Sequence, residues 1–112
     1  MSLTIHTKQP RALVNALLKA IDDGDIDTWE TTDRRHITHS PAQWRCKAWM
    51  KLPKDIGEDT VRFAIIRPKG KSISKSVYAA YHGRFAEMLL SHFDTKIDRI
   101  EISSLASSVD MV

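Results

Sequence analysis

Cysteine is almost absent from this 112-residue sequence, in which Cys46 is the only one. A single thiol cannot form an internal disulfide, so the fold must depend on a hydrophobic core, and we expect a reducing, cytoplasmic environment. Long apolar runs are also absent, so no membrane span or membrane partner is expected. The first residues lack a basic start followed by an apolar stretch, so no signal peptide is expected either.

A largely disordered chain is not indicated, because 42% of the residues are hydrophobic and only 28% are charged. The length suits one core and no more. We see no internal repeat and no interdomain linker. The sequence therefore predicts a single domain over residues 1–112, with residues 103–112 forming a frayed, Ser-rich tail.

Two helices are predicted from apolar residues at three- and four-residue spacing. The first spans Pro10 to Ile21, begins with a proline suited to a first helical turn, and ends before Gly24. The second follows Ser72 or Ser74, either of which can cap it. Its predicted apolar face consists of Val77, Tyr78, Tyr81, Phe85, Met88, Leu89 and His92. Gly83 interrupts this helix, which suggests close approach of another backbone.

Strands are predicted between the helices, at 26–31, 36–39, 44–52 and 61–66. The clearest runs from Trp44 to Leu52, where an inward face alternates with an outward one. The inward face consists of Trp44, Cys46, Ala48, Met50 and Leu52, and the outward face of Arg45, Lys47, Trp49 and Lys51. This alternation places Cys46 inward and Trp49 outward. A short edge strand is predicted at 99–102, and no element is predicted before Pro10.

The predicted fold class is α+β: an antiparallel meander of about four strands in the order α-β-β-β-β-α, with a possible extra edge strand. Because polar and apolar residues alternate along the strands, one face of the sheet is expected to be exposed to solvent. The N-terminal helix and the long C-terminal helix are expected to pack together on the other face.

Charge is divided unevenly along the chain. Residues 34–75 contain eleven Lys or Arg and three acids, a balance of +8, whereas the remainder carries −5, and the total is +3. Such an asymmetry bears on partners rather than on fold.

The predicted wet face carries a candidate binding site for nucleic acid or an acidic protein. Lysine and arginine attract phosphates, and an exposed indole can stack on a base. The predicted residues are Arg45, Lys47, Trp49, Lys51, Arg62, Lys69 and Lys71. We interpret the chain as a small non-enzymatic binding module.

Two alternatives stay open. The same face could form the interface of a homodimer, because exposure of the large apolar ring of Trp49 to water is unfavourable and a second copy of the chain would bury it. A hydrolase or nuclease could instead use His82 as a general acid–base with Arg84 stabilising an anion, although no nucleophile accompanies them.

Metal, cofactor and nucleotide-loop motifs are not predicted. His36 and His39 point to opposite faces of a strand, and Gly24 comes too early for a calcium loop. A phosphate-binding loop would need glycine where Ile65 stands before Gly70-Lys71-Ser72. We therefore predict no catalytic residue, no metal ligand and no cofactor.

Overall fold

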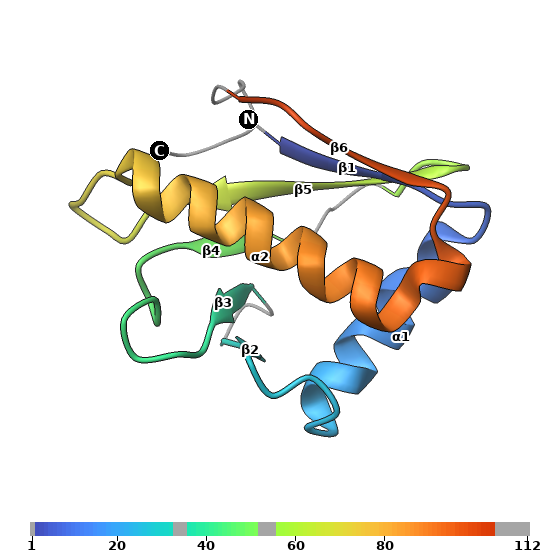
Figure 1. Cartoon of the computed structure of the whole chain (residues 1–112), viewed down its shortest axis with the longest axis horizontal. Helices are drawn as coiled ribbons and strands as arrows, with labels where there is room; N and C mark the ends of the chain where they lie inside the picture. Colours follow the sequence, from blue (N-terminus) through green and yellow to red (C-terminus); the bar gives the residue numbers. More distant parts are fainter. Residues whose placement is uncertain (1, 33–35, 52–55, 105–112) are drawn as a thin grey trace.

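The computed structural model of the protein describes residues 2–32, 36–51 and 56–104. It has two α-helices, a short 3-10 helix and one six-stranded antiparallel sheet in the order β2-β3-β4-β5-β1-β6 (Figure 1). The strands are β1 (Ser2–His6), β2 (Trp29–Thr31), β3 (Ile37–His39), β4 (Trp49–Lys51), β5 (Thr60–Ile66) and β6 (Arg99–Ile102). The α+β class and the meander β2 to β5 are as predicted.

Helix α1 (Pro10–Asp22) begins at its proline and buries Leu13, Val14, Leu17, Leu18 and Ile21, the predicted apolar stripe. Gly24 follows it with a φ of 81°, which a glycine adopts at little cost. Helix α2 (Lys75–Phe93) is capped by Ser74, whose Oγ accepts the Val77 N–H at 3.2 Å. A 3-10 turn, η1 (Asp94–Lys96), leads into β6. No helix in the described ranges has the length and apolarity needed to cross a bilayer.

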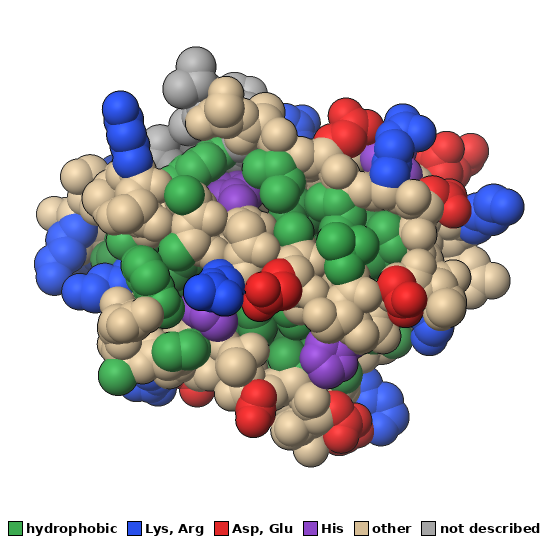
Figure 2. Space-filling model, in the orientation of Figure 1, with side chains coloured by type: hydrophobic (Ala, Val, Ile, Leu, Met, Phe, Trp, Pro, Cys, Tyr) green, Lys and Arg blue, Asp and Glu red, His purple; other side chains and the backbone are tan. Residues whose placement is uncertain are grey.

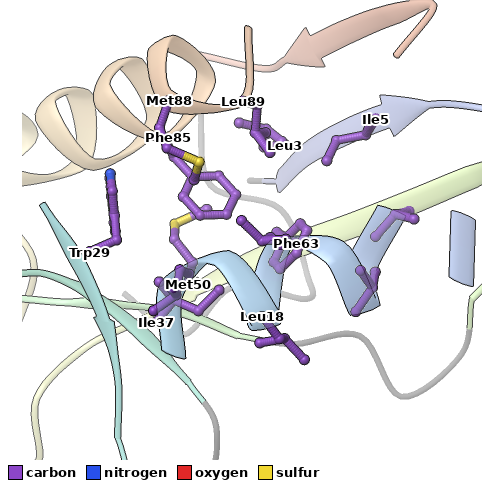
Figure 3. Packing of buried hydrophobic residues seen from close by; sticks show 14 of the residues in the cluster. Leu3, Ile5, Leu18, Trp29, Ile37, Met50, Phe63, Phe85, Met88 and Leu89 are labelled. Carbon is purple, nitrogen blue, oxygen red and sulfur yellow. The ribbon is translucent and has the colours of Figure 1, made fainter. Parts of the chain in front are cut away.

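The core fills the space between one face of the sheet and the helices. Register places Leu3 opposite Phe63, Ile5 opposite Val61, and Met50 opposite Ile65, so these side chains share a face. They join the buried residues of α1 and α2 in one hydrophobic cluster (Figure 3). Full burial of each large side chain contributes about 1.5–3 kcal/mol.

The sheet has more strands than the four predicted, because the first residues form β1. This strand lies inside the sheet between β5 and β6, and its Leu3 and Ile5 are almost completely buried. β6 is the edge strand predicted at 99–102. The five-residue β1 lies in a segment for which no element was predicted, because two inward residues alone are a weak periodic signal.

The predicted strand 44–52 was too long. Only Trp49–Lys51 forms β4; Leu52 lies outside the described residues. Residues 41–47 turn instead, because the Pro41 carbonyl accepts the N–H groups of both Trp44 and Arg45 at 2.8 and 2.9 Å. Cys46 has a φ of 59° and is exposed, which corrects its predicted inward position. Ala48 and Met50, also predicted to face inward, are buried.

One face prediction on α2 was also wrong. His92 is exposed, and His82 is buried in its place. The buried stripe contains His82, Phe85, Leu89 and Phe93 as well as Tyr81 and Met88. It drifts around the helix as α2 crosses the sheet, so His92, although on the predicted apolar side, lies clear of the core. The end of the predicted frayed tail, residues 105–112, lies outside the described residues.

Candidate binding surface and cleft

Three of the predicted site residues share the outer face of the sheet. Trp49 pairs with Ile66 and Lys51 with Ala64 across the β4–β5 ladder. Arg62 stands two residues before Ala64 on β5, so its side chain projects from the same face as that of Lys51. Arg62 is exposed, whereas Lys51 and Trp49 are half-buried.

Trp49 is less available than the sequence indicated. Its indole lies on the outer face, as predicted, but the side chain is half-buried. The indole N–H is enclosed and has no hydrogen-bond partner among the described residues. Only part of the ring is therefore available for stacking on a ligand.

Lys47, Lys69 and Lys71 belong to segments at the same end of the sheet. Because β4 and β5 are antiparallel and Trp49 pairs with Ile66, the chain entering β4 and the chain leaving β5 emerge at the same end. The β5–α2 loop turns at Gly70, where φ is 76°, and exposes both of its lysines. Figure 2, which shows the molecule from the side of α2, has Lys and Arg side chains at the end of the molecule where that loop lies.

Arg45 is separated from this group. It lies in the turn 41–47, and its Nε donates to Glu30 Oε1 on β2 at 2.5 Å. This ion pair neutralises the cation, so Arg45 does not contribute to the positive field. We call the remaining six residues, Lys47, Trp49, Lys51, Arg62, Lys69 and Lys71, the basic surface.

The basic surface has few acidic neighbours in the sequence. No Asp or Glu occurs between Thr60 and Ala86, a stretch that covers β5, the following loop and most of α2. The same stretch contains six Lys or Arg residues. This stretch therefore adds cations but no carboxylates to the chain around the basic surface.

A cleft of about 320 Å³ lies between α2 and the turn 41–47. We call it the α2 cleft. Trp29, Trp44 and Met88 supply apolar lining, and His39, Arg84 and Glu87 supply polar groups. Sequence reasoning missed this arrangement, because it brings together β2, β3, a turn and α2. The only local signal is the helical spacing of Arg84, Glu87, Met88 and Ser91, which places them on one side of α2.

His39 is the buried polar group of the α2 cleft. Its ring stacks on Trp29 with centroids 4.3 Å apart, and Nδ1 lies 2.7 Å from the Thr28 carbonyl. A carbonyl can only accept, so Nδ1 carries the proton, and in the neutral ring Nε2 is an acceptor. Nε2 has no hydrogen-bond partner within the described parts of the chain. Burial lowers the pKa of His39, which keeps the ring neutral near pH 7.

The residues of the hydrolase alternative are not brought together. His82 is buried, stacks on Tyr78 at 4.1 Å, and has Nδ1 2.9 Å from the Tyr78 carbonyl. Arg84 is exposed and lines the α2 cleft. Burial lowers the pKa of His82. A neutral ring enclosed by protein cannot reach a substrate, so the geometry does not favour this pair as a catalytic site.

Metal binding is not favoured by the described side chains, among which no group of three His, Cys, Asp or Glu is arranged to hold an ion. Comparison with protein families, with curated proteins and with solved structures finds no match to this chain.

Proposed function

We propose that the protein is a non-enzymatic binding module that holds single-stranded nucleic acid, or another polyanion, on the basic surface. The observation that carries the proposal is the pairing of β4 with β5. This pairing collects cations from three separate segments, at 47–51, at Arg62 and at 69–71. Phosphate groups are the natural partners of such a surface, because bound cations release the counterions condensed on a nucleic acid.

The half-buried indole of Trp49 suits a strand with exposed bases. A partly accessible aromatic ring beside lysines resembles the stacking platforms that single-stranded nucleic-acid proteins use. Since only part of the ring is accessible, we assign most of the affinity to the cations and a smaller share to Trp49. A single strand bound in this way does not require a groove shaped to hold a duplex.

Salt dependence provides the first test. Fluorescence anisotropy with a labelled oligothymidylate of about 20 nucleotides should show an association constant that falls steeply between about 50 and 200 mM salt. Lys47, Lys69 and Lys71 should each contribute a counterion. The triple variant Lys47→Ala/Lys69→Ala/Lys71→Ala should therefore flatten the slope of log K against log salt by about 2, at roughly 0.7 per phosphate contact.

A matched control removes the same charge at the other end of the molecule. Lys8, Arg11 and Lys96 are exposed and lie near His6, which pairs with Thr60 at the far end of β5. Their triple alanine variant has the same net charge as the first one. Equal loss in both variants would mean a non-specific charge effect and would overturn the proposal, as would no salt-dependent binding by the unmodified protein.

A heparin arm separates the two ligand classes. Binding of heparin fragments with no binding of the oligonucleotide would identify another polyanion as the ligand. In the favoured case, Trp49→Ala lowers oligonucleotide affinity more than heparin affinity, because only the nucleic acid offers bases to stack.

A further inference from the structure

The α2 cleft has the chemistry of a ligand site rather than of a packing defect. His39 is only 6% exposed, yet its Nε2 has no partner among the described residues. That nitrogen is not among the enclosed unpaired side-chain atoms of the described residues, so it is accessible from the cleft that His39 lines and can accept a hydrogen bond from a bound donor. The Nδ1 bond to the Thr28 carbonyl fixes the ring and prevents it from turning away.

The charges of the α2 cleft select a neutral ligand. Arg84 Nη1 and Glu87 Oε1 are 3.5 Å apart and compensate each other. His39 adds no charge while its ring is neutral. A bare anion would compete with Glu87 for the guanidinium, and a bare cation would face Arg84. A ligand with both donors and acceptors but no net charge satisfies both groups.

The aromatic lining of the α2 cleft favours a planar ligand. The ring of Trp44 is half-buried, and Trp29 and Met88 supply further apolar lining. Aromatic rings bind other planar rings by offset or edge-to-face contact. The volume of about 320 Å³ lies at the lower end of the range of known small-molecule sites.

We propose that the α2 cleft binds a neutral planar heterocycle of the nucleobase class, with a ring N–H donating to His39 Nε2. Adjacent donors and acceptors on the edge of a base match Glu87, which accepts, and Arg84, which donates. Stacking on an aromatic ring combined with hydrogen bonds to the edge is how proteins recognise unpaired bases.

The base could come from a free nucleoside or from a strand held on the basic surface. The inference itself does not need the basic surface, because a nucleoside carries no phosphate. Titration of the full chain with guanosine, adenosine, cytidine and uridine separately tests the first source. Titration with short oligonucleotides of each base tests the second.

Nuclear magnetic resonance provides the readout. We expect at least one nucleoside or oligonucleotide to shift the His39 Nε2 resonance and the indole N–H of Trp44, and to leave the enclosed His82 ring unshifted. Glu87→Gln and Arg84→Gln alter only an exposed pair, so they should fold normally and weaken binding about tenfold each, the effect of one lost hydrogen bond to a charged group. Lys75→Gln, an exposed change at the start of α2, should leave the affinity unchanged.

The two proposals can fail separately. If the Lys47/Lys69/Lys71 variant loses the oligonucleotide but still shows nucleoside shifts at His39, the α2 cleft is a base site independent of the basic surface. If only oligonucleotides shift His39, the base is supplied by a strand. The inference is overturned if no nucleoside or oligonucleotide perturbs His39 at millimolar concentration, or if Lys75→Gln weakens binding as much as Glu87→Gln.

Discussion

The hydroxyl oxygens of Thr38 and Tyr81 lie 3.0 Å apart inside the core and connect three segments of the chain. Thr38 Oγ1 donates to the Ala48 carbonyl at 2.9 Å and accepts the Cys46 N–H at 3.0 Å. Tyr81 Oη, from α2, donates to the Trp44 carbonyl. This network fixes the turn 41–47 against β3 and α2, and so positions Trp44 at the α2 cleft.

Removing the Tyr81 hydroxyl should destabilise the protein measurably. Tyr81→Phe keeps the buried ring but removes one of the two donors to the Trp44 carbonyl, the other being the Lys47 N–H at 3.1 Å, and this should lower the free energy of unfolding by about 1 kcal/mol. Urea denaturation followed by circular dichroism measures the change. Tyr78→Phe removes a hydroxyl from a half-buried residue bonded to the Ser103 carbonyl and should cost less. Equal effects of the two changes would contradict the network.

Stability should decrease as the solution becomes mildly acidic. Burial lowers the pKa of both His82 and His39 from the ordinary value of 6.5, so the folded protein holds these rings neutral. Below pH 6.5 the unfolded chain binds more protons than the folded one. The free energy of unfolding is therefore highest above pH 7 and falls as the pH is lowered through 6.5.

Other charged and titratable side chains face His39. Arg84 and Glu87 of α2 act on it in opposite directions, and His92 lines the same cleft. Denaturation curves at pH 7.5 and pH 5.5 should show a smaller difference for His82→Phe than for the unmodified protein. A pH dependence unchanged by His82→Phe would contradict the assignment to that ring.

Gly83 should be replaceable with a gain in stability. The sequence suggested that it permits close approach of another backbone, but a Cβ built there meets nothing within 4 Å in the described structure. Gly83→Ala should raise the free energy of unfolding by about 1 kcal/mol, the difference in helix propensity. Gly70→Ala is a control substitution with the opposite expected effect. Because φ is 76° at that turn, the change should lower the free energy of unfolding by about 1 kcal/mol. A loss of stability in Gly83→Ala would indicate a contact with a partner.

Cys46 should react with thiol reagents in the folded protein. The predicted nine-residue strand would bury it, whereas the turn 41–47 exposes it. Absorbance at completion of an aromatic disulfide reagent assay should give one thiol per chain without denaturant, with Cys46→Ser as the blank. A thiol that reacts only after unfolding would favour the extended strand.

Periodicity predicted the elements whose buried residues recur along one segment. α1, α2 and β5 were found because each contains enough inward residues to establish a period of 3.6 or 2. The same criterion predicted a strand at 44–52 that is longer than the observed β4. Alternation there is real, but the Pro41 carbonyl and the Thr38 hydroxyl capture the backbone N–H groups of residues 44–46. These competing hydrogen bonds come from tertiary structure and cannot be read locally.

Some features of the candidate sites follow from local sequence patterns, and others depend on tertiary structure. Lys51, Arg62 and Trp49 share a face because strand alternation fixes side-chain direction. The lysines of the β5–α2 loop lie at the same end of the sheet as Lys47 because the chain enters β4 and leaves β5 at that end of the antiparallel pair. The pairing of Arg45 with Glu30 depends instead on where β2 lies in the sheet. The α2 cleft depends on the path of the turn over α2, which no local pattern encodes.

The position of β1 has a consequence for the order of assembly. Its partners on both sides, β5 and β6, are synthesised more than fifty residues later, so β1 cannot enter the sheet until those strands have been made. Loss of β6 would leave the buried first strand as an open edge able to pair with other molecules. β6 therefore covers the otherwise open edge of β1 once the sheet is complete.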